Sequence, residues 1–144
     1  MLPRLVTLLL LPLLFGCRPA TLPPVATEPP PVNLPASVQQ LTPDQTAALM
    51  QSTPDLVIVD LREGWELKAE GIIAGSQHID YLNSKLFEES IARLDPSKSY
   101  LLYCAIGGRS RLAAAAMSGK GFTHLALMAG GTDAWLKAGK TLVK

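Results

Sequence analysis

The residues best suited to chemistry lie in one segment, Tyr103 to Arg111, where a cysteine is followed by two glycines and an arginine. The apolar run from Leu101 predicts a buried strand, and the alanine-rich stretch from about Ser110 predicts a helix. Cys104 therefore enters a loop at a helix N-terminus. Backbone N–H groups converge there with the positive end of the helix dipole, which stabilises a thiolate, a persulfide or a bound oxyanion.

The residues after Cys104 favour a reactive thiol over an inert one. Gly107 and Gly108 allow the backbone to curl tightly around one point. Arg109 adds a cation at the rim, which favours the nucleophilic thiolate form. The alternative is a buried structural cysteine at a strand end, but the Gly-Gly-Arg sequence argues against it.

The first residues have the pattern of an export signal. Arg4 is followed by the apolar stretch Leu5 to Phe15, which is shorter than the roughly 20 residues needed to span a bilayer. Leu14 to Cys17 resembles the lipobox of bacterial lipoproteins, which implies removal of residues 1–16 and a lipid on Cys17. An ordinary cleaved signal is the alternative. The resemblance implies a lipid-anchored protein of the bacterial cell envelope, at the outer membrane facing the periplasm if the host has two membranes.

Residues 17–36 are rich in proline, including Pro23-Pro24 and Pro29-Pro30-Pro31. Such a segment is an extended, semi-rigid spacer of about 3 Å per residue. We expect it to link the lipidated Cys17 to one folded domain at residues 37–144.

The composition excludes several kinds of protein. The net charge is +1, and removal of Arg4 with the signal leaves twelve basic and twelve acidic side chains, which argues against a nucleic-acid partner. If Cys17 is acylated, Cys104 is the single free thiol, so neither an internal disulfide nor a resolving cysteine is available. Two histidines with one thiol do not suit a structural zinc site, and we expect neither metal nor cofactor. The sequence does not set the oligomeric state.

Strand and helix patterns alternate along the rest of the chain, which predicts an α/β fold with a parallel sheet of four or five strands flanked by helices. Strands are expected at 38–41, 56–60, around 78–79, at 99–103 and at 124–128. Helices are expected at 43–51, 63–70, 82–94, 110–118 and 132–138. Thr42 should cap the first helix, with Pro43 at its first position.

Asp60 and Arg62 follow the apolar strand at its carboxyl end, which is the edge where ligands bind in open α/β sheets. We expect them to support the loop region through an ion pair, with a purely structural role as the alternative. Arg111 either draws anions toward the site or is a solvated helix residue. Trp135 is expected in the core.

Four motifs together resemble the single-domain rhodaneses. The segment Cys104-Ala105-Ile106-Gly107-Gly108-Arg109-Ser110 is similar to their active-site loop. The other three matches are Asp60-Leu61-Arg62-Glu63 with Glu66, Gly71 to Ile79, and the block containing Gly121-Phe122, Gly130-Gly131 and Ala134-Trp135. The resemblance implies a rhodanese-like three-layer sandwich and a sulfurtransferase. Cys104 would take sulfane sulfur from a donor such as thiosulfate, hold it as a persulfide within the loop of residues 105–110, and pass it to a thiol or to cyanide.

Two other kinds of protein share part of this pattern. A cysteine-dependent phosphatase or arsenate reductase has five residues between cysteine and arginine, whereas four separate Cys104 from Arg109. A non-catalytic binding or sulfur-carrier module is the alternative of a different class, and such modules often lack the cysteine. His78 and His124 stand in no motif that would pair either of them with Cys104.

Overall fold

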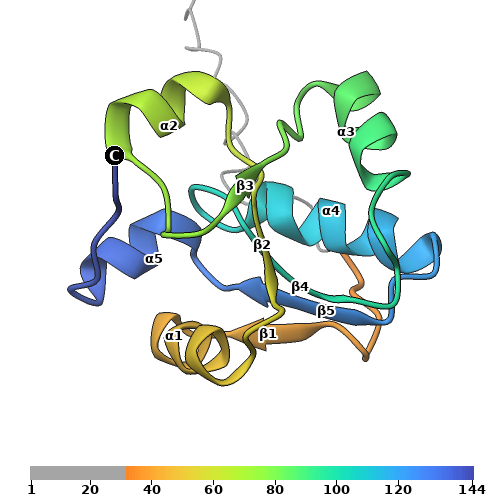
Figure 1. Cartoon of the computed structure of the whole chain (residues 1–144), viewed down its shortest axis with the longest axis horizontal. Coiled ribbons are helices and arrows are strands. Elements are labelled where there is room, and N and C mark those ends of the chain that lie inside the picture. Colours follow the sequence, from red (N-terminus) through yellow and green to blue (C-terminus); the bar gives the residue numbers. More distant parts are fainter. Residues whose placement is uncertain (1–31) are drawn as a thin grey trace, which may run out of the picture.

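The computed structural model describes residues 32–144, which form a sheet covered by helices on both faces (Figure 1). Cys17, the expected signal segment and the proline-rich stretch up to residue 31 lie outside the described residues. The strands are β1 (Gln39–Leu41), β2 (Val57–Asp60), β3 (Gln77–His78), β4 (Ser99–Tyr103) and β5 (His124–Met128). The helices are α1 (Pro43–Ser52), α2 (Gly64–Glu70), α3 (Ser84–Ile91), α4 (Gly108–Gly119) and α5 (Gly131–Lys137).

All five strands pair in parallel, in the order β1-β5-β4-β2-β3. The expected α/β fold with a parallel sheet is therefore confirmed. Because β4 lies between β2 and β5, its carboxyl end has strand ends on both sides. The loop that follows β4 is thus at the middle of the ligand-binding edge of the sheet.

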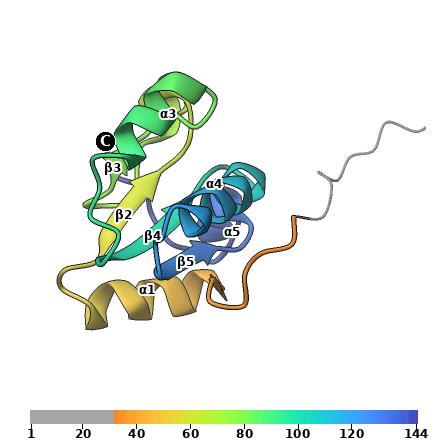
Figure 2. The ribbon, with the colours of Figure 1, turned by 90° about the vertical axis from the view of Figure 1, so that its right-hand side faces the viewer.

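Two apolar clusters cover the two faces of the sheet. One contains Leu102 and Cys104 and packs against α3 and α4, while the other contains Leu101 and Tyr103 and packs against α1 and α5. Figure 2 shows α1 on one side of the sheet and α3 and α4 on the other. Successive residues of a strand point to opposite faces, so Tyr103 and Cys104 belong to different layers. Trp135 lies in the second cluster, 7% exposed, as expected for a core residue.

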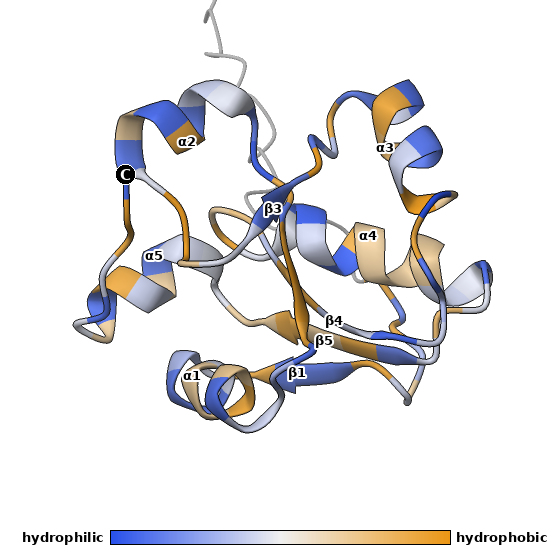
Figure 3. Ribbon diagram, viewed as in Figure 1, coloured by the Kyte–Doolittle hydropathy of each residue, from blue (hydrophilic) through white to orange (hydrophobic). Residues whose placement is uncertain are grey.

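Colouring by hydropathy separates the buried strands from the amphipathic helices (Figure 3). Strand β2 is hydrophobic along most of its length, which agrees with a central strand covered on both faces. In α3 the hydrophobic residues Phe87 and Ile91 are buried, whereas Leu86 is 51% exposed and the charged residues face outward. No helix within residues 32–144 is both long enough and apolar enough to cross a membrane.

Local capping explains where the helices begin and end. Thr42 caps α1 as predicted, because its hydroxyl accepts from the N–H of Gln45 at 3.3 Å and the Gln45 side chain accepts from the N–H of Thr42 at 2.9 Å. The helix predicted over 82–94 is shorter, since Asp80 takes the N–H groups of Leu82 and Asn83 into a turn. Asn83 then caps α3.

Residues that precede Ser37, the expected start of the domain, already contact the folded part of the chain. Leu34 packs against the cluster that contains Leu102 and Cys104. Arg111 on α4 donates to the carbonyl of Val32 at 3.3 Å and to Oε1 of Gln40 at 2.7 Å. Residues 32–34 are therefore held against the first turn of α4.

Candidate active site

Cys104 follows β4 directly, and the chain turns into α4 within four residues. Gly107 occupies the N-cap position with φ +98°, a left-handed conformation that favours glycine. This turn starts α4 at Gly108, two residues before the predicted start. The Cys104 residue is 1% exposed, so its thiol lies beneath the loop and not on the surface.

The loop presents backbone donors to the sulfur. The N–H of Gly107 points to Sγ of Cys104 at 3.1 Å, and Oγ of Ser110 lies 3.9 Å from Sγ while donating to the carbonyl of Gly107 at 3.0 Å. Among the residues the structure describes, no hydrogen-bond acceptor is paired with the N–H groups of residues 105, 106 and 108–110. A negatively charged sulfur group at Cys104 would therefore have several unused donors beside it.

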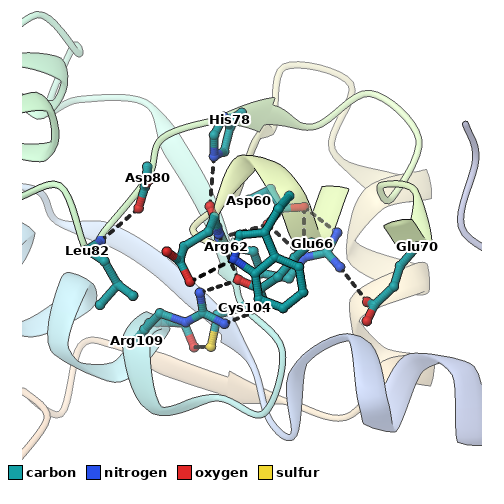
Figure 4. A network of polar contacts seen from close by, with 12 residues as sticks. Asp60, Arg62, Glu66, Glu70, His78, Asp80, Leu82, Cys104 and Arg109 are labelled. Carbon is teal, nitrogen blue, oxygen red and sulfur yellow. Dashed lines mark hydrogen bonds and ion pairs between the residues drawn. The ribbon is translucent and has the colours of Figure 1, made fainter. Parts of the chain in front are cut away.

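Arg109 does not stand free at the rim, as a loop cation would. Its guanidinium makes a two-point contact with Glu66 of α2, with distances of 2.6 Å to Oε2 and 2.8 Å to Oε1 (Figure 4). The hydrogen bonds to Glu66 raise the pKa of Arg109, and the charge of Cys104 raises it further. The same hydrogen bonds lower the pKa of Glu66. Arg109 therefore ties α4 to α2 across the site.

Asp60 and Arg62 form the expected ion pair, with Nη2 of Arg62 2.7 Å from Oδ2 of Asp60, and both side chains are fully buried. Burial alone would lower the pKa of Arg62, but the hydrogen bond and charge of Asp60 outweigh this and raise it. Arg62 also donates to Glu70 at 2.8 Å and to the carbonyl of Gly71 at 2.6 Å. No hydrogen bond joins either residue to 104–110 in the described structure.

The Asp60–Arg62 pair meets β4 on the face opposite Cys104. The hydroxyl of Tyr103 donates to Oδ2 of Asp60 at 2.7 Å, lies 2.9 Å from Oγ of Ser76 and accepts from the N–H of Ile73 at 3.1 Å. Burial, with the charge of Asp60, raises the pKa of Tyr103, which keeps the phenol neutral as a donor. The pair thus fixes the strand ends around the site without reaching the thiol.

The amino end of α5 holds the loop from below. Thr132 N–H donates to the carbonyl of Cys104 at 2.9 Å, and Asp133 N–H donates to that of Ala105 at 3.0 Å. A Cβ added to Gly131 would overlap both carbonyl oxygens, and the φ of Gly131 is +58°. The Gly130-Gly131 pair therefore lets α5 approach closely enough to turn the loop carbonyls away from the thiol.

Only some of the candidate residues lie around the Cys104 sulfur. Cys104, Gly107 and Ser110 meet around Sγ, while Ile106 is 66% exposed at the outer side of the loop. His78 donates from Nε2 to the carbonyl of Arg62 at 2.7 Å and His124 is an exposed strand residue, so neither is hydrogen-bonded to Cys104. No group of three or more potential metal-binding side chains occurs in residues 32–144.

Two parts of the site were absent from the sequence-based candidates. Glu66 is named above only within a motif, although a glutamate three residues after Glu63, where a helix is expected to begin, is a signal for a helix-start partner. In the structure its Oε2 does accept from the N–H of Glu63 at 2.8 Å. Gly131 is also named above only within a motif, as part of Gly130-Gly131. Two adjacent glycines after a buried strand are the signal for a close backbone approach.

Fold and site together define a class: a parallel α/β domain with a cysteine held in a strand-to-helix loop of backbone donors. The model of the Rhodanese-like domain family matches residues 42–138. The chain therefore belongs to the rhodanese-like domain family.

Solved structures agree with this assignment. A protein of unknown function from Rhodopseudomonas palustris, described as a possible tyrosine phosphatase, is 33% identical, with 74% of this chain and 86% of that chain covered and a TM-score of 0.65. The polysulfide-sulfur transferase homodimer of Wolinella succinogenes is 29% identical over 75% and 80% of the chains, with a TM-score of 0.60. A rhodanese-related protein from Thermoplasma volcanium is 26% identical over 73% and 97%, with a TM-score of 0.61. Comparison with curated proteins found no significant match.

Proposed function

We propose that this protein is a sulfurtransferase that carries sulfane sulfur on Cys104. The observation that supports this most is the Gly107 N–H at 3.1 Å from Sγ, within a loop whose other N–H groups have no protein acceptor among the described residues. Such a loop stabilises a thiolate before transfer and a persulfide anion after it. The sulfurtransferase among the similar structures adds family support.

The reaction needs two displacements at sulfur. The Cys104 thiolate attacks the outer sulfur of a donor such as thiosulfate, the S–S bond of the donor breaks, and sulfite leaves with the electron pair. A thiol or cyanide then attacks the outer sulfur of the Cys104 persulfide, and Sγ leaves as thiolate. Both steps use one cysteine and the loop of residues 105–110. The proposed partners are therefore a small sulfur donor and a thiol acceptor.

The test is to load the protein with sulfur. Full-length protein is incubated with thiosulfate or with a small persulfide, freed of excess donor, and analysed by intact mass beside a Cys104→Ser variant. We expect a gain of one sulfur atom that is lost on adding thiol or cyanide. Sulfur that also remains on the Cys104→Ser variant would be on Cys17, and failure to load Cys104 from either donor would favour a binding module.

A phosphatase is the second candidate, because the Rhodopseudomonas palustris structure is described as a possible tyrosine phosphatase. In such a reaction the loop arginine must be available to the phosphate, whereas both terminal nitrogens of Arg109 bind Glu66 at 2.6 and 2.8 Å. Hydrolysis of an aryl phosphate that depends on Cys104 would favour this candidate. We expect none above the Cys104→Ser variant.

We also propose that the mature chain begins at Cys17 and is held at the bacterial cell envelope by a lipid on that residue. The support is the Leu14 to Cys17 sequence and the proline-rich segment after it. A folded domain on such a spacer would work tens of ångströms from the membrane.

A further inference from the structure

The charges around Cys104 bear on which thiol can collect the sulfur. The inference rests on the proposed function, because it concerns the second displacement, in which an acceptor thiolate attacks the outer persulfide sulfur. An acceptor with a carboxylate brings a further negative charge to the loop, whereas an acceptor with an ammonium group brings a positive one. The side chains near the loop decide between them through their net charge.

The cation nearest to the thiol is already neutralised. Arg109 is 19% exposed in its side chain and Glu66 8%, and their two-point contact leaves no terminal nitrogen of Arg109 without a carboxylate oxygen. Arg62 is fully buried and paired with Asp60. Arg111, on the same helix as Arg109, is directed to Gln40 and to the carbonyl of Val32. None of these three arginines offers an unoccupied cation at the mouth of the loop.

Two of the three charged side chains that line the groove beside the loop are negative, Glu63 and Asp80, and the third is Lys85. Glu63 lies next to the Arg109 contact, because its N–H donates to the same Oε2 of Glu66 that binds Arg109. Glu63, Asp80 and Leu82 line one groove between α2 and α3 of about 430 Å³. Figure 4 shows Asp80 and Leu82 in the same close view as Arg109 and Cys104. Lys85, also at this groove, faces Glu89 at 3.9 Å.

The strand ends bring the segments that carry these carboxylates to the same edge of the sheet as Cys104. The N–H of Leu61 donates to the carbonyl of Tyr103 at 2.9 Å, and the N–H of Ile79 donates to that of Asp60 at 2.9 Å. The ends of β2, β3 and β4 are therefore adjacent, and they carry Glu63, Asp80 and Cys104 respectively. On the other side of the loop, the exposed Asp133 donates its N–H to Ala105.

The positive end of α4 does not reverse this balance. A helix N-terminus corresponds to about half a positive charge, whereas the persulfide anion itself carries a full negative charge. The exposed side chain at the centre of the loop is Ile106, which is apolar. We infer that the physiological acceptor is a thiol without negative charge near its sulfur, either neutral or cationic, and that Glu63 and Asp80 enforce this selection.

The transfer of sulfur to the acceptor needs no reactant besides the acceptor thiol. The acceptor thiolate forms a bond to the outer sulfur, the bond between that sulfur and Sγ breaks, and the electron pair returns to Sγ of Cys104. The acceptor leaves as a persulfide, and its proton is exchanged with solvent. No external oxidant or reductant is consumed.

The experiment compares three small thiols of similar size and different charge. Full-length protein loaded with sulfur is mixed with cysteamine, mercaptoethanol or mercaptopropionate near neutral pH, and the loss of the added sulfur is followed by intact mass. Because the thiols differ in intrinsic reactivity, the rate of sulfur loss with each thiol is divided by the rate at which the same thiol reacts with a small-molecule persulfide. This quotient is the corrected rate. We expect the corrected order cysteamine, mercaptoethanol, mercaptopropionate, from fastest to slowest.

Two variants that remove a charge test whether Glu63 and Asp80 cause the selection among acceptor thiols. Glu63→Gln and Asp80→Asn keep side-chain shape and one oxygen acceptor, and each should reduce the corrected ratio of cysteamine to mercaptopropionate by about five-fold at low salt, because each removes one negative charge from the groove beside the loop. Asp95→Asn, in an exposed turn after α3, is the matched control and should leave the ratio unchanged. Added salt should reduce the selection in the wild type.

The outcomes separate this inference from the proposed function. A corrected order that favours mercaptopropionate, or a ratio that is the same in wild type, Glu63→Gln and Asp80→Asn, overturns the charge selection while the sulfurtransferase stands. If Cys104 takes up no sulfur from any donor, the proposed function fails, and the selection fails with it.

Discussion

At the scale of single residues, Glu66 determines what Arg109 can do. Because Glu66 occupies both terminal nitrogens of Arg109, this arginine positions the loop against α2 and does not serve as a free anion receptor. Glu66 as a whole residue is 6% exposed, so the pair lies mostly out of water, where hydrogen bonds between charged groups contribute more to stability. The contact therefore contributes to folding as well as to the site.

The lowered pKa of Glu66 predicts a pH-dependent stability. A carboxyl whose pKa in the folded state lies below its ordinary value of 4.5 stabilises the fold above that value, and this contribution is lost as pH falls through the folded pKa. Glu66→Gln should therefore cost about 2 kcal/mol of unfolding free energy near neutral pH. The difference from wild type should shrink below pH 4.5, as measured by urea unfolding followed by circular dichroism.

The matched control is Glu89→Gln. Glu89 faces Lys85 at 3.9 Å with 46% of its side chain exposed, so its loss should change stability by less than about 0.5 kcal/mol at any pH. An equal pH dependence in the two variants would contradict the role given to the Arg109–Glu66 pair.

Tyr103 is a second residue whose role can be isolated. Its hydroxyl forms hydrogen bonds with Asp60, Ser76 and the N–H of Ile73 on the face opposite Cys104. Tyr103→Phe should lower the unfolding free energy by about 2 kcal/mol, because it leaves buried polar groups without a partner. Sulfur loading of Cys104 should stay near the wild-type level.

The comparison for Tyr103→Phe is Tyr100→Phe, since the Tyr100 hydroxyl makes a single bond, to the carbonyl of Asp95 at 2.8 Å. We expect a smaller loss of about 1 kcal/mol. If Tyr103→Phe abolished loading while remaining folded, the network would belong to the chemistry and not to the support of the strands.

At the scale of elements, the loop is fixed from three sides. Strand β4 delivers Cys104, α4 begins around it, and α5 takes up the carbonyls of Cys104 and Ala105. With these carbonyls engaged by α5, the N–H groups of the loop are left for a ligand. The close approach of α5 depends on the absence of a side chain at Gly131.

Gly131→Ala should therefore disturb the loop more than an ordinary glycine substitution would. The new methyl group would overlap the carbonyls of Cys104 and Ala105, so sulfur loading should fall at least about ten-fold and stability should fall by several kcal/mol. Gly139→Ala is the control: its φ is +75° but its Cβ would meet open space, so only about 1 kcal/mol of backbone strain is expected. Equal loading by both variants would show that α5 does not shape the loop.

How far the sequence predicts the site depends on whether its parts are local. The loop from Cys104 to Ser110 could be recognised because its strand, glycines and helix are consecutive in the chain. The partner of Arg109 could not, since Glu66 lies 43 residues away and meets it only because β2 pairs with β4. The helix expected over 82–94 begins too early, because its apolar pattern includes Leu82, which precedes Asn83. The side chain of Asn83 accepts from the N–H of Leu86 and sets the actual start of the helix at Ser84.

At the scale of the whole molecule, the described domain joins its N-terminal segment at α4, the helix that carries the loop. Leu34 packs against the core and Arg111 binds the carbonyl of Val32, so the segment approaches the domain beside the first turn of α4. If Cys17 is lipidated as proposed, the membrane lies on the far side of a proline-rich spacer from this contact.

The proposed lipid on Cys17 predicts where the protein is found. In a bacterial host, wild-type protein should sediment with the membrane fraction and gain the mass of a lipid-modified N-terminal cysteine. Cys17→Ser should be recovered without lipid and should still load sulfur on Cys104. Wild-type protein with a free Cys17 thiol in the soluble fraction would contradict the anchor.

The contact between Arg111 and Val32 has a mechanical consequence. Tension applied to the chain before residue 32 is transmitted through the Val32 carbonyl to the guanidinium of Arg111, two residues beyond Arg109. The first turn of α4 therefore bears load before β1 does. If Cys17 carries the proposed lipid, a stretched chain between that residue and Val32 would pull on the helix whose N-terminus surrounds Cys104, and a slack one would leave that helix undisturbed.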